Sequence, residues 1–333
     1  MVSSGYIKKS PNQLEISVVM PLYNKENEVK RSVEAVLSQT FGDFELVVVN
    51  DGSTDKGPKI VKAMDDPRIR IIDQPNAGVS TARNRGVVEA QAGLIAFLDA
   101  DDEWESHFLE TIICLRGKFP LCDVFATNYS FRRENNYRRP TIIRGLPNEF
   151  REGILTDYFR IASQSDPPLC SSAVAVTRRA IEKVGGFPLR ITAGEDLLTW
   201  ARLAVRYEIA YTMEPKAYFW EPVELSDRQG RVPDEPDIVG QELEVLLTTY
   251  SDYKRKGLKD YIALWHRMRS SIFIQLGRRW NALEEIQKAL HFSGINRKLL
   301  FYMLGAILPN KFAVNLMKFI KRKTQDRDLF LRR

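Results

Sequence analysis

Three aspartates stand directly after an apolar run. Residues 95–98 read IAFL, and Asp99, Asp101 and Asp102 follow within four positions. Carboxylates this close together repel one another unless a positive charge lies among them. Oxygen ligands of this kind suit Mg²⁺ or Mn²⁺, which commonly take phosphate oxygens as further ligands. A solvated loop in which Asp99 or Asp101 caps the next helix is the other interpretation, and the run alone does not decide between the two.

A second pair of acids, Glu195 and Asp196, opens the segment GEDLLTWARLA at residues 194–204. This segment is expected to be a helix, and acidic side chains near the N-terminus of a helix are stabilised by its dipole. Taken by itself, the pair is explained as the start of a helix. Any role in chemistry must come from its wider context.

The elements that must position these acids are strands and helices in alternation. Apolar runs rich in β-branched residues occur at 16–20, 45–49 and 94–98. Runs without strict polar alternation are typical of strands buried on both faces of a parallel sheet. Helical spacing of apolar residues lies between them, at 28–40 and 79–93. This order predicts an open α/β sheet with right-handed crossovers.

Polar segments follow these expected strands at the point where each one ends. They are residues 21–24, 50–53 and 99–102. In open α/β sheets, ligands bind beyond the carboxyl ends of the strands. The three segments are therefore expected to converge on one edge of the sheet and to form a binding cleft there.

The order of these motifs is similar to that of family 2 glycosyltransferases. The chain contains, in sequence, ISVVMPLYNKE, VVVNDGSTD, NAGVSTARNRG, AFLDADDEW, GGF and GEDLLTWARL. The resemblance covers roughly residues 14–220 and does not extend to the C-terminal part of the chain. It implies an inverting enzyme with the GT-A fold, the α/β fold of nucleotide-diphospho-sugar transferases.

The resemblance also implies which residues bind the sugar donor. Pro21 and Tyr23 would lie against the nucleotide base, and Asp51 would meet the edge of that base. Asn76 and Arg83 would contact the ribose or the diphosphate, with Arg83 as a cation suited to phosphate. From the residues alone, core packing of Tyr23, turn chemistry at Asp51 and a solvated helix face at Arg83 all stay open.

Roles for the acids follow from the same resemblance. Asp99 would touch the ribose or the sugar, and Asp101 would ligate the Mg²⁺ or Mn²⁺ ion that bridges the diphosphate. Asp102 would assist or hold the loop. Inverting transfer needs a base that takes the proton of the acceptor hydroxyl. Asp196 is expected to be that base, and Glu195 to position it or to touch the acceptor.

Charge divides the chain into two unequal parts. Residues 251–333 contain 19 Lys and Arg against 6 Asp and Glu, a net charge of +13, whereas the whole chain has a net charge of +6. A proline-containing stretch at 221–237 is a plausible boundary. The expected organisation is a flexible N-terminus at 1–13, a GT-A domain at 14–225 and a basic helical region at 226–333.

The basic region contains apolar stretches flanked by Lys and Arg at residues 297–323. Basic amphipathic helices of this kind bind anionic membrane surfaces, which would place the protein at the inner face of the cell membrane. Packing of the same apolar residues on the catalytic domain or on another helix is an equal alternative. Nucleic acid is not an expected partner, because no recognition motif accompanies the charge.

Composition limits the remaining classes. The cysteines are only Cys114, Cys122 and Cys170, and the first residues lack a secretion signal, so a reducing cytoplasmic location is expected. No G-x-G-x-x-G motif follows the first strand, which argues against a dinucleotide-dependent oxidoreductase. The leading function is transfer from a UDP-sugar to a glycan or lipid-linked acceptor in surface polysaccharide synthesis. The alternatives are a non-catalytic nucleotide-sugar or glycan-binding module and a sugar nucleotidyltransferase.

Overall fold

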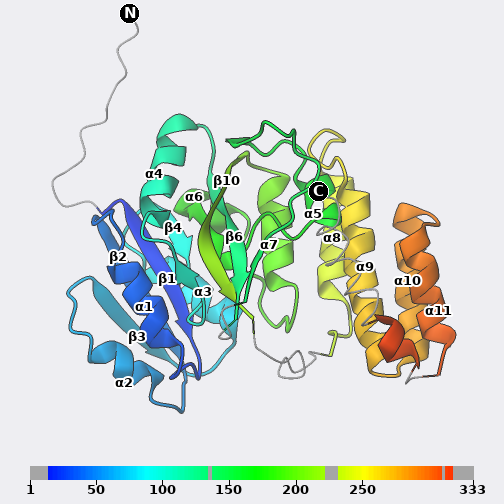
Figure 1. The fold of residues 1–333 in the computed structure, drawn as a ribbon, viewed down its shortest axis with the longest axis horizontal. Coiled ribbons are helices and arrows are strands. Elements are labelled where there is room, and N and C mark those ends of the chain that lie inside the picture. Colours follow the sequence, from blue (N-terminus) through cyan, green and yellow to red (C-terminus); the bar gives the residue numbers. More distant parts are fainter. Residues whose placement is uncertain (1–13, 134–136, 222–231, 310–311, 318–333) are drawn as a thin grey trace, which may run out of the picture.

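A computed structural model of the chain describes residues 14–133, 137–221, 232–309 and 312–317. The predicted flexible N-terminus, most of the predicted domain boundary and the last residues of the basic region lie outside the described residues. Within the described residues, one mixed sheet forms the centre, and the C-terminal helices stand against one side of it (Figure 1).

The central sheet has ten strands, and eight of them lie in the order β3-β2-β1-β4-β9-β6-β10-β5, with β7 and β8 paired at its margins. The expected parallel half is present, because β1 pairs in parallel with β2 and β4, and β2 pairs in parallel with β3. The antiparallel β9 joins this half to the parallel pair β6 and β10. The strands are β1 (Ile16–Leu22), β2 (Phe44–Asp51), β3 (Ile69–Gln74), β4 (Leu94–Phe97), β5 (Glu103–Trp104), β6 (Val124–Arg132), β7 (Arg138–Pro140), β8 (Glu152–Ile154), β9 (Val174–Thr177) and β10 (Ile209–Trp220).

Helices cover both faces of the sheet. The apolar side chains of α1, α2 and α4 pack on one face, and those of α3, α5, α6 and α7 pack on the other. The helices are α1 (Val29–Leu37), α2 (Gly57–Lys62), α3 (Val79–Glu89), α4 (Phe108–Lys118), α5 (Tyr158–Gln164), α6 (Arg178–Lys183), α7 (Glu195–Ala204), α8 (Ile238–Thr249), α9 (Leu258–Gln275), α10 (Arg279–Ser293) and α11 (Arg297–Ile307). A short 3₁₀ helix, η1 (Ser171–Ala173), precedes β9.

The strands are buried on both faces, as their continuous apolar composition predicts. In β1, Val18 and Met20 point to the core under α1, whereas Val19 points to the opposite core. All three side chains are fully buried. Because successive side chains of a strand alternate between faces, an unbroken apolar run satisfies both cores at once.

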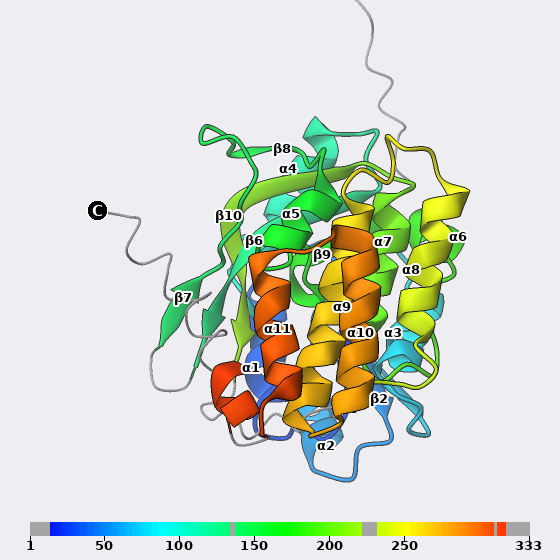
Figure 2. The ribbon, with the colours of Figure 1, turned by 90° about the vertical axis from the view of Figure 1, so that its right-hand side faces the viewer.

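The C-terminal helices share the core of the sheet. Leu243 of α8 and Tyr261, Ile262 and Trp265 of α9 belong to the same buried cluster as Phe97 of β4. The helices α10 and α11 then lie beside α9 and form a separate small core with it (Figure 2). The predicted boundary near residue 225 stays a prediction, but hydrophobic packing is continuous across it. Among the described helices, none combines the length and apolarity needed to cross a bilayer.

Candidate active site

The ends of β1 and β2 meet, as the strand order requires. The Asn24 N–H donates a hydrogen bond to Ser53 Oγ at 3.2 Å, and the Ser53 hydroxyl donates to the carbonyl oxygen of Leu22 at 3.4 Å. Pro21 is half-buried beside them, and the Tyr23 side chain is 47% exposed. Tyr23 is therefore not a core residue, and its ring is accessible at the edge of the sheet.

Asp51 holds the loop that leads into α3. Its buried carboxylate accepts hydrogen bonds from the Gln74 side chain at 2.7 Å and from the N–H groups of Ala77 and Gly78 at 2.9 Å each. Gly78 has φ of +90°, a conformation that side chains with a Cβ rarely adopt. This arrangement presents Asn76 on the surface next to the end of β2.

The side-chain hydrogen bond that stabilises the turn after β2 is made by Asn50 rather than by Asp51. Its Oδ1 accepts a hydrogen bond from the Ser53 N–H at 3.0 Å, and its Nδ2 donates to Asp73 at 2.8 Å. This is the side-chain-to-backbone bond typical of Asx turns. Asp51 is left to act on a segment 26 residues away.

The three acids after β4 point to different partners. Asp99 accepts from the Arg83 guanidinium at 2.7 and 3.0 Å, and Asp101 pairs with Lys25 at 2.7 Å. Asp102 is buried, and accepts from the Ser172 hydroxyl at 2.5 Å and from the Trp220 N–H at 3.0 Å. Burial, together with the charges of Asp101 and Asp99, raises the pKa of the Asp102 carboxyl. Asp102 therefore joins the loop to η1 and β10.

A divalent cation fits one of these acids. Asp101 has a side chain 36% exposed, and Lys25 opposite it is flexible and 37% exposed. Although burial opposes the charged form, Asp101 raises the pKa of Lys25. A single accessible carboxylate suits Mg²⁺ or Mn²⁺, which keep waters and take the remaining ligands from a diphosphate. Asp102 fits less well, because it is only 1% exposed and its carboxylate accepts hydrogen bonds from Ser172 and from the Trp220 N–H.

Arg83 joins the loop after β4 to the start of α7. Its Nη2 lies 2.7 Å from Asp99 Oδ1, and its Nη1 lies 3.5 Å from Glu195 Oε1. The side chain is buried, so the solvated-face interpretation of Arg83 is wrong. Although burial opposes the charge, Asp99 and Glu195 raise the pKa of Arg83. One buried guanidinium thus brings together the two acidic motifs of the sequence.

Arg83→Met is expected to lower the free energy of unfolding by about 3–5 kcal/mol, because it leaves Asp99 and Glu195 without their buried cation. Arg85→Met on the same helix is the matched control. Arg85 is exposed and pairs with Glu89 one turn away, so its loss should cost about 0.3–0.5 kcal/mol. Urea unfolding followed by circular dichroism measures both, and equal losses would contradict the bridging role.

The start of α7 places its two acids in different environments. Glu195 is buried against Arg83, whereas Asp196 is partly exposed and lines a cavity of about 360 Å³. Asp196 Oδ1 accepts from the N–H of Leu197 at 2.7 Å. Gly194 before them has φ of +89°, and a Cβ there would lie 2.6 Å from the ring of Trp265. The turn that presents Asp196 is therefore shaped by α9.

Comparison with known proteins decides the family. The model of the family described as "Glycosyl transferase family 2" matches residues 17–185, about half of the chain. The chain belongs to this family. The matched residues include the ends of β1, β2 and β4, together with Arg83 and Asp101.

Relatives in other organisms carry related names. An uncharacterized glycosyltransferase of Escherichia coli, YibD, is 40% identical over 103 residues, which are 30% of each chain. An uncharacterized glycosyltransferase of Rickettsia bellii is 29% identical over 206 residues, 62% of this chain and 28% of that one. The chondroitin synthase of Pasteurella multocida is 34% identical over 155 residues, 44% of this chain and 16% of that one. These matches span less than a third of each relative's length.

Solved structures agree in fold over nearly the whole chain. Staphylococcus aureus TarS 1–349 in complex with UDP-GlcNAc has a TM-score of 0.65 at 17% identity and covers 94% of this chain and 91% of its own. The mannosyltransferase of Pyrobaculum calidifontis in complex with GDP-Man and Mn²⁺ has a TM-score of 0.55 at 17% identity, with 96% and 88% covered. The expected GT-A fold with a helical C-terminal extension is confirmed.

Several residues at the site of this family 2 member carry no local sequence signal. Ser172 and Trp220 reach Asp102 from 70 and 118 residues away. Arg31 donates to the carbonyl oxygen of Asp101 at 2.8 Å, and its guanidinium lies 3.8 Å from the centre of the Trp220 ring. Lys25 lies within the motif ISVVMPLYNKE and Arg31 within the predicted helix at 28–40, but neither was singled out as a site residue.

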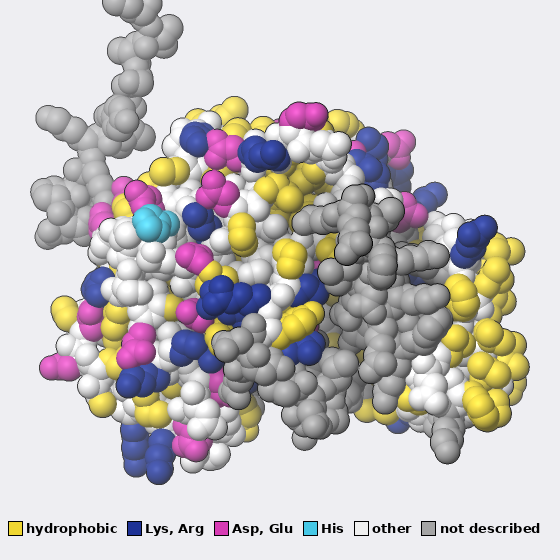
Figure 3. Space-filling view, viewed as in Figure 1, with side chains coloured by type: hydrophobic (Ala, Val, Ile, Leu, Met, Phe, Trp, Pro, Cys, Tyr) yellow, Lys and Arg dark blue, Asp and Glu magenta, His cyan; other side chains and the backbone are white. Residues whose placement is uncertain are grey.

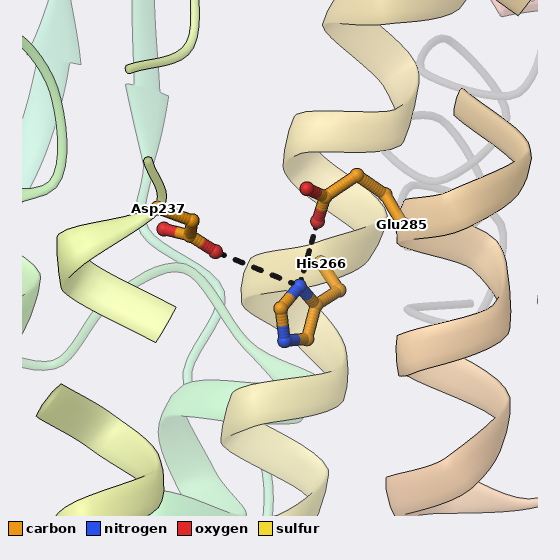
Figure 4. Close-up of side chains that lie close together, drawn as sticks. All are labelled: Asp237, His266 and Glu285. Atoms are coloured by element: carbon orange, nitrogen blue, oxygen red, sulfur yellow. Dashed lines mark hydrogen bonds and ion pairs between the residues drawn. The ribbon is translucent and has the colours of Figure 1, made fainter. Parts of the chain in front are cut away.

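A separate cluster of possible metal ligands lies in the C-terminal region. Among the described residues, Asp237, His266 and Glu285 have ligand atoms within 4.8 Å of one another, and His266 Nδ1 lies 2.6 Å from Glu285 Oε2 (Figure 4). Arg269 Nε already lies 2.9 Å from Glu285 and 3.4 Å from Asp237. Because this guanidinium neutralises the carboxylates, we interpret the cluster as a cross-link between the start of α8 and the helices α9 and α10.

Proposed function

We propose that this protein is an inverting glycosyltransferase. It moves a sugar from a nucleoside-diphosphate donor, a UDP-sugar, to a hydroxyl group of a glycan or lipid-linked acceptor in surface polysaccharide synthesis. The single observation that supports this most is the Arg83 bridge, with Asp99 on one side at 2.7 Å and Glu195 on the other at 3.5 Å. It links Asp99, which is expected to contact the donor, to Glu195, which precedes the expected base Asp196.

On the acceptor side, the partly exposed Asp196 is the base. The acceptor O–H bond breaks and its proton passes to the Asp196 carboxylate, while the oxygen forms a bond to the anomeric carbon. The bond from that carbon to the diphosphate oxygen breaks, and its electron pair leaves with the nucleoside diphosphate. Glu195, held by Arg83, fixes the first turn of α7 and so positions Asp196.

On the donor side, the base lies against Pro21 and Tyr23, with Asp51 at its edge. Asn76 is the contact to the ribose or the diphosphate, and Asp99 contacts the ribose or the sugar. Arg83 acts on the donor through Asp99, with which it pairs. Asp101 would hold Mg²⁺ or Mn²⁺, and such an ion, when bound, would supply positive charge that stabilises the departing diphosphate.

Related proteins support the donor and acceptor classes. The TarS structure that matches this chain holds UDP-GlcNAc, and the mannosyltransferase structure holds GDP-Man with Mn²⁺. Relatives by sequence include a chondroitin synthase and a hyaluronan synthase of Pasteurella multocida. These relatives support a nucleoside-diphosphate-sugar donor and a polysaccharide acceptor for this protein.

Calorimetric titration of UDP and of GDP, each with and without Mn²⁺, tests the proposal. We expect UDP to bind, and to bind more tightly when Mn²⁺ is present. If only GDP bound, and did so in a metal-dependent way, the donor would be a GDP-sugar rather than a UDP-sugar. Binding of neither nucleotide would contradict the proposal and favour a non-catalytic module.

We propose further that α11 contacts an anionic membrane surface at the cytoplasmic face of the cell membrane. Leu299 and Ala306 of α11 are buried against α9 and α10, whereas Leu300, Leu304 and Ile307 are exposed. Hydrophobic side chains gather at the end of the molecule where α10 and α11 lie (Figure 3). Because α11 is apolar on both faces, its outer face is expected to be buried against another surface. The net charge of +13 over residues 251–333 favours an anionic membrane as that surface.

Liposome flotation tests this contact. Ile307→Glu should abolish binding to vesicles that contain phosphatidylglycerol, because a charge then replaces an inserting apolar side chain. Val88→Glu on α3 is the matched control, since Val88 is 73% exposed and Ile307 is 69% exposed. The proposed membrane contact would be contradicted if the Ile307→Glu variant still bound the vesicles, or if the wild type did not bind them.

A further inference from the structure

The cavity beside Asp196 is built by two parts of the chain that are distant in sequence. The sheet side contributes Tyr129 of β6 and Phe219 of β10, and α9 contributes Trp265, Met268 and Ile272. Its volume of about 360 Å³ lies within the range of small-molecule sites in proteins. The α9 residues lie outside residues 17–185, so the family match does not account for this wall.

The walls of the cavity include six aromatic residues among nineteen, and several of the polar groups of the lining are already paired. The Tyr129 hydroxyl donates to the carbonyl oxygen of Pro167 at 3.0 Å, and the Trp265 indole N–H donates to Asp237 at 3.0 Å. Glu221 at the margin pairs with Arg133 at 2.8 Å. These rings therefore present apolar faces to the cavity rather than hydrogen-bonding groups.

The Asp196 carboxylate is a polar group of the lining that remains for a ligand, because the hydrogen bond that it accepts from the Leu197 N–H occupies only one of its oxygens. The indole N–H of Trp200, another lining residue, has no hydrogen-bond partner among the described residues, but this atom is buried and is not accessible from the cavity.

The α9 wall is held rigidly. Arg269 donates to Glu285 at 2.9 Å and to the carbonyl oxygen of Asp234 at 3.1 Å, and the Asp234 carboxylate accepts from the Thr192 N–H at 2.8 Å. Thr192 lies just before the turn that carries Asp196. Hydrogen bonds thus link the network around His266 to the turn that carries Asp196.

We propose that this cavity binds the terminal sugar ring of the acceptor, a pyranose whose C–H faces pack on the aromatic rings. One ring hydroxyl reaches the Asp196 carboxylate. A hydrocarbon chain is a poorer occupant, because it would bury the Asp196 carboxylate without a partner. This inference rests on the proposed function and adds that α9, outside the family match, selects the acceptor.

The test is saturation-transfer NMR with methyl glycosides of glucose, galactose, N-acetylglucosamine and rhamnose, in the presence of UDP and Mn²⁺. Met268→Trp and Ile272→Trp each narrow the cavity from α9. Met268 is 40% exposed and Ile272 is half-buried, so both variants should fold. Leu276→Trp is the matched control, because Leu276 follows α9, is 42% exposed and does not line the cavity.

We expect at least one glycoside to bind the wild type, to lose at least tenfold in affinity in the two cavity variants and to bind Leu276→Trp as it binds the wild type. No glycoside binding to the wild type, or equal binding to all variants, would overturn the subsite. Binding of farnesyl phosphate in place of every glycoside would overturn it as well. UDP titration of the same samples separates the two proposals, since retained UDP binding without glycoside binding removes only the acceptor subsite.

Discussion

Asp196→Asn should lower the rate of sugar transfer by about 10²–10⁴-fold, the usual contribution of a positioned general base. The amide cannot take the proton of the acceptor hydroxyl, yet its shape and its hydrogen bond from the Leu197 N–H are kept. Binding of UDP with Mn²⁺ should therefore equal that of the wild type. The rate is measured as nucleotide release with the UDP-sugar and acceptor that the wild type turns over.

The simpler explanation of Asp196, an acid that stabilises the start of a helix, makes a different prediction. Asp260 stands in the first turn of α9, is exposed and does not line the cavity beside Asp196. Asp260→Asn should cost about 0.3–1 kcal/mol of stability and leave transfer unchanged. If Asp196→Asn behaved like Asp260→Asn, the base would have to be sought elsewhere.

Asp101→Ala should remove the dependence of UDP binding on Mn²⁺. The loss of metal affinity should be at least the 10–100-fold that outer-shell changes typically cause, since a direct ligand is removed. Without Mn²⁺, the variant should bind UDP as the wild type does. The calorimetric titration of UDP with and without Mn²⁺ measures both quantities.

Two variants make this result specific to Asp101. Glu34→Ala removes an exposed carboxylate on α1 that pairs with Lys30, and it should leave the Mn²⁺ dependence intact. Lys25→Met removes the cation that lies 2.7 Å from Asp101, and it should preserve or strengthen Mn²⁺ binding. Unaltered Mn²⁺ dependence in Asp101→Ala would place the metal on another residue.

The elements of the sheet half that carries the donor motifs were predictable from local pattern. The apolar runs at 16–20, 45–49 and 94–98 became β1, β2 and β4, and the helical spacing at 28–40 and 79–93 became α1 and α3. Burial on both faces favours a continuous apolar run, and the short length and β-branched residues of these runs indicate strands rather than buried helices. The convergence of their carboxyl ends then follows from parallel pairing.

The partners of the acids were not predictable in the same way. The sequence shows Asp99, Asp101 and Asp102 as one negative run, whereas the structure turns them toward Arg83, Lys25 and the buried Ser172, respectively. Arg83 and Arg85 alternate along one helix, and only packing of α3 against the sheet decides that the first is buried. No local pattern records which of two neighbouring charges faces the core.

The amino-acid pattern was thus sufficient to predict the α/β sheet, because strand burial and helical spacing are local properties, and the resemblance of the ordered motifs to family 2 glycosyltransferases implied the GT-A fold, the family and the acids that the proposed chemistry uses. Tertiary structure decided which acid stays accessible and that α9 completes the cavity beside Asp196. Those outcomes depend on contacts such as Arg83 with Glu195 and Gly194 with Trp265, which join segments far apart in the chain. Such contacts form only when the two cores of the sheet close, and no single segment contains the information.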